Sequence, residues 1–153
     1  MKALSIWQPF ASLVVAGHKK IEVRTWATEH RGPLLICSTA GDLDLGDNRF
    51  APGGHALGTV NLVDVRPMVE ADIELACLGK LTKKERADVL RSKAWVFESP
   101  KEILPVPVKG KQGLFSLEIP LGPLPEEFIR LAHANDTLAH IEYYSHLVKA
   151  KGR

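Results

Sequence analysis

Every apolar run in this chain is short and ends within a few residues at a glycine, a proline or a charged side chain. The 153 residues include 12 glycines and 10 prolines, and both residue types interrupt helices and strands. Several runs alternate between apolar and polar residues, which is the period of a strand. No regular strand–helix–strand rhythm appears, and no glycine fingerprint for phosphate binding follows the first expected strand. The pattern therefore favours a small mixed α+β domain around a closed or nearly closed barrel over a doubly wound sheet.

Five or six short strands and a few short helices are expected. The strands are expected at residues 4–6, 21–26, 34–37, 55–65, 94–97 and 114–119, with an edge segment at 103–108 that contains Pro105 and Pro107. Helices are expected at residues 10–16, 67–78, 82–91 and 125–150, the last one interrupted near Asn135 and Asp136. Residues 39–55 are expected to form a loop, because four glycines and three aspartates dissolve the pattern there.

Charge and cysteine content narrow the class of protein. Twenty basic and 18 acidic side chains give a net charge of +2, so contact with RNA or DNA would need a local basic patch. Cys37 and Cys77 each stand alone in an apolar run, which is typical of a reduced intracellular chain. No apolar run approaches the ~20 residues that cross a bilayer, and no signal-peptide core is recognisable. We therefore expect a cytoplasmic protein without a membrane partner.

The densest polar cluster follows Gly17 and has the sequence GHKKIEVRTW. Glu22 and Arg24 lie on one face of the expected strand, with Trp26 beside them. An ion pair that faces a core loses hydration, whereas a solvated pair contributes little to stability. The cluster is therefore either an exposed strand face or the charged part of a binding site.

The start of the chain, KALSIWQPFASL, followed by G-x-K-x-x-E-x-R from Gly17 to Arg24, resembles the ASCH (activating signal cointegrator 1 homology) domain family. The segments 30–36 and 58–64 are similar to the second and third strands of the family, and the segment 95–115 is similar to the closing part of the longer ASCH proteins. The resemblance thus covers residues 2 to about 120. It implies a PUA-like β-barrel, a fold that recurs in RNA-binding and RNA-modifying proteins. We therefore expect a PUA-like ASCH domain over residues 1–122 and a C-terminal helical extension over residues 123–153.

The resemblance leaves three functions open. The first is an RNA- or nucleotide-binding domain with single-stranded RNA or a nucleotide as its partner. The second is a hydrolase of RNA or of N-acylated cytosine nucleosides, because some small bacterial members resemble amidohydrolases of that kind. In those members the motif lysine and a threonine at the glutamate position take part; Lys19 matches the lysine, and Glu22 replaces the threonine. Lys19 and Glu22 are thus the catalytic candidates. The third is a protein-interaction module with a vestigial pocket.

The same residues can form a nucleotide site. Tryptophan rings offer faces on which bases stack, an amide can pair with a base edge, and cations can meet phosphate. The expected ligand-binding residues are Trp7, Gln8, Pro9, Lys19, Glu22, Arg24, Trp26, Asp64, Lys109 and Lys111. Core packing is the alternative for both tryptophans, a strand-end turn for Asp64, and a solvated hairpin for the two later lysines.

Within this set we expect Glu22 to hold the Arg24 guanidinium, because a carboxylate matches its geometry, and Lys19 to remain free for the ligand. No cofactor motif is present. The six histidines lack the close spacing of metal ligands, so neither a metal nor a cofactor is expected.

Overall fold

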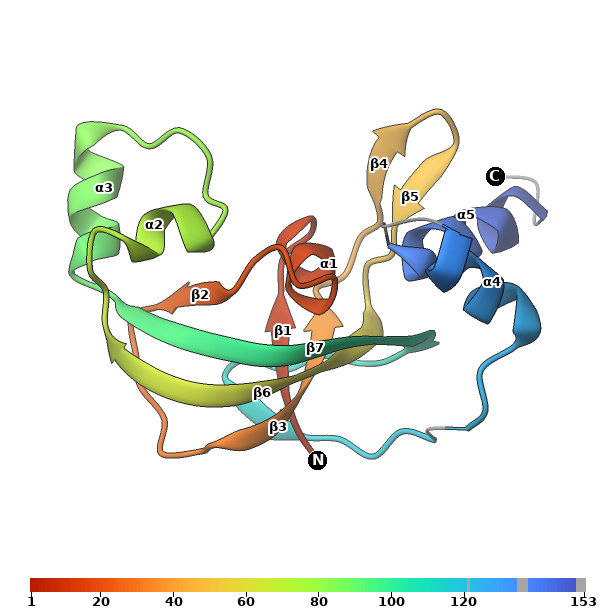
Figure 1. The fold of residues 1–153 in the computed structure, drawn as a ribbon, viewed down its shortest axis with the longest axis horizontal. Helices are drawn as coiled ribbons and strands as arrows, with labels where there is room; N and C mark the ends of the chain where they lie inside the picture. The colour runs from red at the N-terminus through yellow and green to blue at the C-terminus, as the bar shows by residue number, and fades with distance from the viewer. Residues whose placement is uncertain (121, 135–137, 151–153) are drawn as a thin grey trace.

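The computed structural model describes residues 1–120, 122–134 and 138–150. Its centre is a curled six-stranded sheet with the order β2-β7-β6-β3-β1-β8 (Figure 1). The strands are β1 (Lys2–Ile6), β2 (Ile21–Arg24), β3 (Gly32–Ser38), β6 (His55–Pro67), β7 (Lys93–Pro107) and β8 (Leu114–Ser116). Only β1 and β3 are parallel neighbours in this sheet; the other pairs are antiparallel. The expected mixed α+β fold around a barrel-like sheet is confirmed.

Helix α1 (Phe10–Val15) packs against β1, β3, β6 and β7. Its Ala11 and Val14 are buried in the main core, together with Leu62 and Trp95 from the two longest strands. Gly17 follows the helix with a φ of 85°, a conformation that glycine adopts without steric cost. This turn sends the chain from α1 into β2, whose Arg24 reaches the carbonyl of Ser5 on β1.

The connection between β6 and β7 carries two small helices, α2 (Asp72–Leu75) and α3 (Lys83–Leu90). Thr82 and Glu85 form the expected capping box at the start of α3, with hydrogen bonds of 3.1 and 2.9 Å. The expected helix at 67–78 is wrong in extent, because Asp72 accepts the Val69 amide and starts a helix of four residues there.

The expected loop at 39–55 contains a two-stranded hairpin, β4 (Leu43–Gly46) and β5 (Arg49–Ala51). Its turn has three consecutive residues with positive φ, at Gly46 (82°), Asp47 (52°) and Asn48 (58°). Glycine, aspartate and asparagine are the residues that tolerate this conformation in tight turns. The purely irregular loop was therefore a wrong prediction for residues 43–51.

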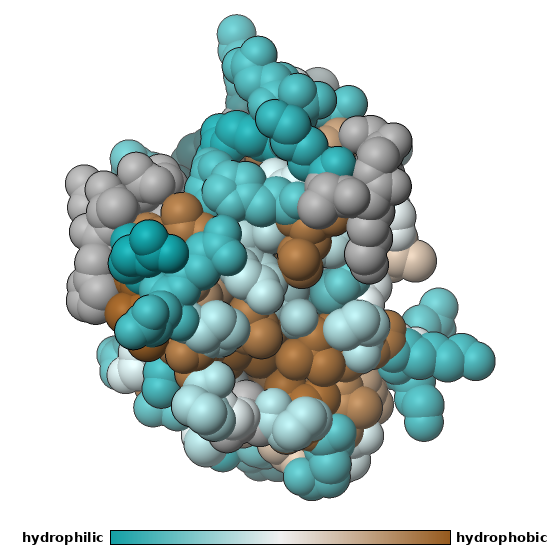
Figure 2. All heavy atoms as spheres, turned by 90° about the vertical axis from the view of Figure 1, so that its right-hand side faces the viewer, coloured by the Kyte–Doolittle hydropathy of each residue, from teal (hydrophilic) through white to brown (hydrophobic). Residues whose placement is uncertain are grey.

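Two helices, α4 (Glu126–Ala134) and α5 (Ala139–Ala150), follow the barrel, and α5 packs against β5 and β7. Figure 2 shows the side of the molecule that carries α4 and α5, and hydrophobic side chains are gathered on it. The expected interruption near Asn135 and the last three residues lie outside the described part of the chain. The division at residues 122 and 123 stays a prediction. No helix within the described residues combines the length and apolar character needed to span a membrane.

Candidate functional site

A cleft of about 760 Å³ lies between the end of β1, the end of β2, the turn that precedes β6 and the loop between β7 and β8. Five of the residues expected from the sequence line it together: Trp7, Arg24, Trp26, Lys109 and Lys111. The remaining wall is supplied by Ser5, Ser38, Thr39, Ala40, Gly54, Val108, Gly110, Gln112 and Gly113. Segments that are far apart in the sequence thus converge on one opening.

The two tryptophans have different roles in this wall. Trp7 follows β1 and is 74% exposed, so its ring is accessible to a ligand. Trp26 lies edge-on against Trp95, with ring centroids 4.7 Å apart, and its carbonyl accepts the Trp95 indole N–H at 3.1 Å. Trp26 therefore belongs partly to the core, and Trp7 is the more accessible stacking surface.

The loop at 108–113 contributes the two lysines, which are both exposed. A Cβ on Gly110 would lie 2.6 Å from Ser5 Oγ, so the loop lies close against the Ser5 side chain. The Ser5 hydroxyl is buried and has no hydrogen-bond partner among the described residues. Ser5 was not predicted as a site residue, because a serine inside a short strand carries no signal of its own.

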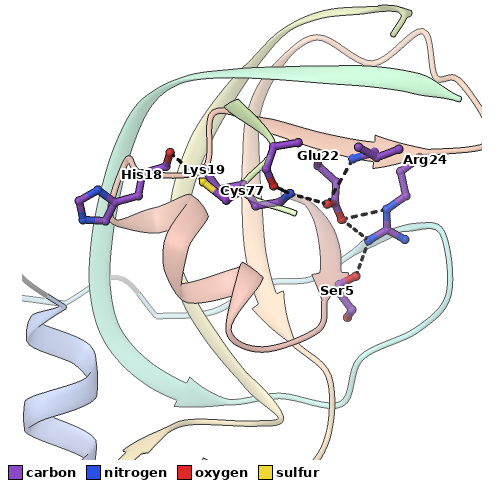
Figure 3. A network of polar contacts seen from close by, with 8 residues as sticks. Ser5, His18, Lys19, Glu22, Arg24 and Cys77 are labelled. Atoms are coloured by element: carbon purple, nitrogen blue, oxygen red, sulfur yellow. Dashed lines mark hydrogen bonds and ion pairs between the residues drawn. The ribbon is translucent and has the colours of Figure 1, made fainter. Parts of the chain in front are cut away.

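The charged residues of the G-x-K-x-x-E-x-R motif form a contiguous cluster (Figure 3). Lys19 is 1% exposed; its Nζ donates to the carbonyl of Ala76 and lies 3.6 Å from Glu22 Oε1. The ammonium group also lies 5.1 Å from the centre of the Phe10 ring. Burial lowers the pKa of Lys19 below its ordinary value, although the neighbouring Glu22 acts in the opposite direction.

Arg24 connects this cluster to the cleft. Its Nε and Nη2 donate to Glu22 Oε2 at 3.2 and 2.9 Å, and Nη2 also donates to the carbonyl of Ser5 at 2.9 Å. Because Ser5 lies on β1 and Arg24 on β2, the guanidinium bridges two strands that are not neighbours in the sheet. Glu22 holds Arg24 as expected, but Lys19 is not free: it is bound to the Ala76 carbonyl and to Glu22 and does not line the cleft.

The remaining expected residues lie outside the cleft. Gln8 donates its amide to the carbonyl of Pro52 at 2.9 Å and accepts the Ser12 amide at 3.0 Å, so it supports the backbone. Pro9 immediately precedes α1. The side chain of Asp64 is 52% exposed and pairs with Arg66 at 3.8 Å. The cleft thus groups Trp7, Arg24, Trp26, Lys109 and Lys111, and neither Pro9 nor Asp64 lines it. Gln8 lines a smaller adjoining hollow with Trp7, Thr39 and Ala40.

A second polar cluster was missed, because its members are widely separated in the sequence. His140 on α5 hydrogen-bonds to Ser12 Oγ through Nε2 at 2.7 Å and to Glu102 Oε1 through Nδ1. Hydroxyl, imidazole and carboxylate also form hydrolase triads, but here Ser12 is 1% and His140 is 0% exposed. The cluster therefore joins α5 to α1 and β7 and offers no accessible nucleophile.

This second cluster predicts acid sensitivity. Burial by itself would raise the pKa of Glu102, but hydrogen bonds from the His140 ring and backbone outweigh it and lower the pKa below 4.5. A lowered pKa stabilises the fold above the unfolded-state value, and that contribution is lost as the pH falls through the folded-state value. Glu102→Gln should cost ~1.5–3 kcal/mol of unfolding free energy at pH 7 and less below pH 4.5. Denaturant titrations of the wild type and the variant at pH 7 and at a pH below 4.5 measure this cost. An equal cost at the two pH values would contradict the prediction.

Comparisons with known proteins agree with this architecture. Residues 4–107 match the family model of the ASCH domain. Human activating signal cointegrator 1 is 30% identical over 139 residues, and the mouse protein is 27% identical over 139 residues. Each alignment covers 75% of this chain but 22% of the relative, so the chain spans less than a quarter of these curated relatives.

Solved structures show the same fold at low identity. The ASCH protein of Zymomonas mobilis has a TM-score of 0.56 at 17% identity, with 76% of this chain and 87% of that chain covered. A mutant form of the same bacterial protein gives a TM-score of 0.56 at 16% identity, with 76% of this chain and 89% of that chain covered. Because the family model matches more than half of the residues, the chain belongs to the ASCH domain family.

Proposed function

We propose that this ASCH domain binds single-stranded RNA or a nucleotide in the cleft between β1, β2 and the loop at 108–113. The observation that carries the proposal is the convergence of an exposed tryptophan and three cations on one opening of about 760 Å³. The ASCH family is associated with RNA binding, which agrees with this chemistry.

The charge of the cleft favours an anionic ligand. Arg24, Lys109 and Lys111 line it, and none of the described lining residues is acidic. The net charge of the chain is only +2, so these cations are a local concentration of positive charge. Phosphate oxygens take hydrogen bonds from lysine, arginine and backbone amides alike.

The aromatic wall favours a single strand over a duplex. A base stacks on a tryptophan only when it is released from its helical neighbours, as in loops and single strands. Trp7 is 74% exposed beside the cations, so a base and its phosphate can be bound together.

Hydrolysis is less well supported. The Lys19 ammonium group is 1% exposed and is bonded to Ala76 and Glu22, so it does not reach a ligand in the cleft. Glu22 binds Arg24, which occupies the carboxylate that a general base would need. A binding domain therefore agrees better with the geometry than the amidohydrolase or ribonuclease alternative does.

The salt dependence of binding tests the proposal. If Arg24, Lys109 and Lys111 contact about three phosphates, the slope of log affinity against log salt is about −2 for a single strand. Fluorescence polarisation of a labelled single-stranded RNA across a salt series measures this slope. Replacing both Lys109 and Lys111 by alanine should weaken binding and reduce the slope to about −0.7.

The matched control is a double alanine variant of Lys83 and Lys84, which are exposed on α3 and do not line the cleft. It removes the same charge and should leave the slope near its wild-type value of about −2. A wild-type slope near zero, or an equal loss in both double variants, would reject the cleft as the site of a nucleic acid.

A further inference from the structure

The position of the basic loop depends on one turn in the segment between β5 and β6. Gly54 lines the cleft, and its amide donates to the carbonyls of Ser38 and Thr39 at 3.1 and 2.9 Å. Its carbonyl accepts the amide of Val108 at 2.9 Å, at the point where the loop with the two lysines begins. A shift of this turn would therefore move the start of the loop.

Two side chains fix the turn at Gly53. Asp42 Oδ1 accepts the Gly53 amide at 2.9 Å, and His55 Nδ1 hydrogen-bonds to the Gly53 carbonyl at 2.7 Å. Backbone packs closely here, since a Cβ on Gly53 would collide with the backbone of Gly41. The turn is thus tightly packed, and Asp42 and His55 hold it through hydrogen bonds.

Tyr144 on α5 contacts both of these side chains. Its hydroxyl donates to Asp42 Oδ2 at 2.8 Å, and its ring meets the His55 ring edge-on with centroids 5.0 Å apart. The helix is itself attached to β5, because Glu142 pairs with Arg49 at 2.7 Å and Ser145 Oγ accepts the Phe50 amide at 2.8 Å. Tyr144, which lies outside the residues 4–107 that match the family model, therefore contacts both Asp42 and His55.

We propose that Tyr144 is a positioning residue for the ligand cleft: through Asp42 and His55 it fixes the turn at Gly53 and Gly54 and so the loop that carries Lys109 and Lys111. This inference rests on the proposed function for its effect on RNA. The C-terminal extension is then part of the binding apparatus.

The test compares Tyr144→Phe with Tyr143→Phe, which removes a hydroxyl from the same helix. The ring of Tyr143 packs against the ring of Phe128, with centroids 5.9 Å apart. Tyr143→Phe therefore controls for a general effect of hydroxyl removal on α5. Two quantities are measured: affinity for a labelled single-stranded RNA, and amide hydrogen exchange at Gly53 and Val108. Tyr144→Phe should weaken RNA binding about 2- to 10-fold, the range of one lost hydrogen bond, and should accelerate exchange at both amides.

Exchange of the β3 amides in the core should stay unchanged, which separates local loosening from global destabilisation. The inference is overturned if Tyr144→Phe matches Tyr143→Phe in both measurements, or if exchange accelerates while RNA affinity is unaltered. If the wild-type domain binds no RNA, the proposed function fails, and exchange alone decides whether Tyr144 holds the turn. Unchanged exchange at Gly53 and Val108 would then overturn the inference as well.

Discussion

Replacing Glu22 with alanine should lower the free energy of unfolding by about 3 kcal/mol or more. Its side chain is 11% exposed and pairs with Lys19 at 3.6 Å and Arg24 at 2.9 Å. Removing one charge from a buried ion cluster leaves the opposite charges buried without a partner, which typically lowers the free energy of unfolding by ~3–5 kcal/mol. Urea denaturation of the variant and the wild type at neutral pH measures the difference.

Two further variants sharpen this test. Asp88→Ala breaks a surface ion pair between Asp88 and Arg91, whose side chains are 53% and 72% exposed. This variant should change the free energy of unfolding by less than ~1 kcal/mol. Lys19→Met removes the buried ammonium and keeps most of its volume, so it should cost less than Glu22→Ala. A Glu22→Ala cost as small as that of Asp88→Ala would show that the motif charges are solvated.

The largest effect on binding is expected for Trp7→Ala. Stacking of one base on an aromatic ring is worth ~1–3 kcal/mol, so affinity for single-stranded RNA should fall by about 5- to 150-fold. The melting temperature should change little, because the side chain is 74% exposed and surface substitutions usually stay within ~0.5 kcal/mol. Polarisation titrations and melting curves on the same preparation separate the two effects.

Trp7→Phe retains a flat ring and should recover most of the affinity, which distinguishes stacking from a change in the neighbouring backbone. Trp26→Ala provides the contrast, because that ring packs edge-on against Trp95 and its loss should also lower the melting temperature. Wild-type affinity in Trp7→Ala would remove the stacking surface from the proposal.

The sequence predicted the elements whose patterns are local. The alternation at residues 21–26 and the capping box at Thr82 and Glu85 both correspond to observed elements, β2 and α3. The hairpin at 43–51 was missed because its two strands are four and three residues long. Its packing against α5, far along the chain, carries no local signal.

The candidate site was predictable in part for the same reason. Stacking and cationic side chains can be recognised by type, and five of the residues chosen in this way line one cleft. The burial of Lys19 was not predictable, because its ammonium group binds the carbonyl of Ala76. Ala76 lies in the connection between β6 and β7, more than fifty residues further along the chain. The hydrogen bonds from His140 to Ser12 and from Tyr144 to Asp42 link residues more than a hundred positions apart, and hydrophobic periodicity does not encode such pairs.

The engagement of the motif charges has an evolutionary consequence. Lys19, Glu22 and Arg24 bind one another and the backbone of Ser5 and Ala76, and only Arg24 of the three lines the cleft. A paralogue that retains these three residues inherits the bridge between β1 and β2, whatever it binds. Mutations at the exposed Trp7, Lys109 or Lys111 can then exchange one ligand for another with little penalty in folding. The residues that hold β1 and β2 together are thus largely separate from those proposed to contact the ligand.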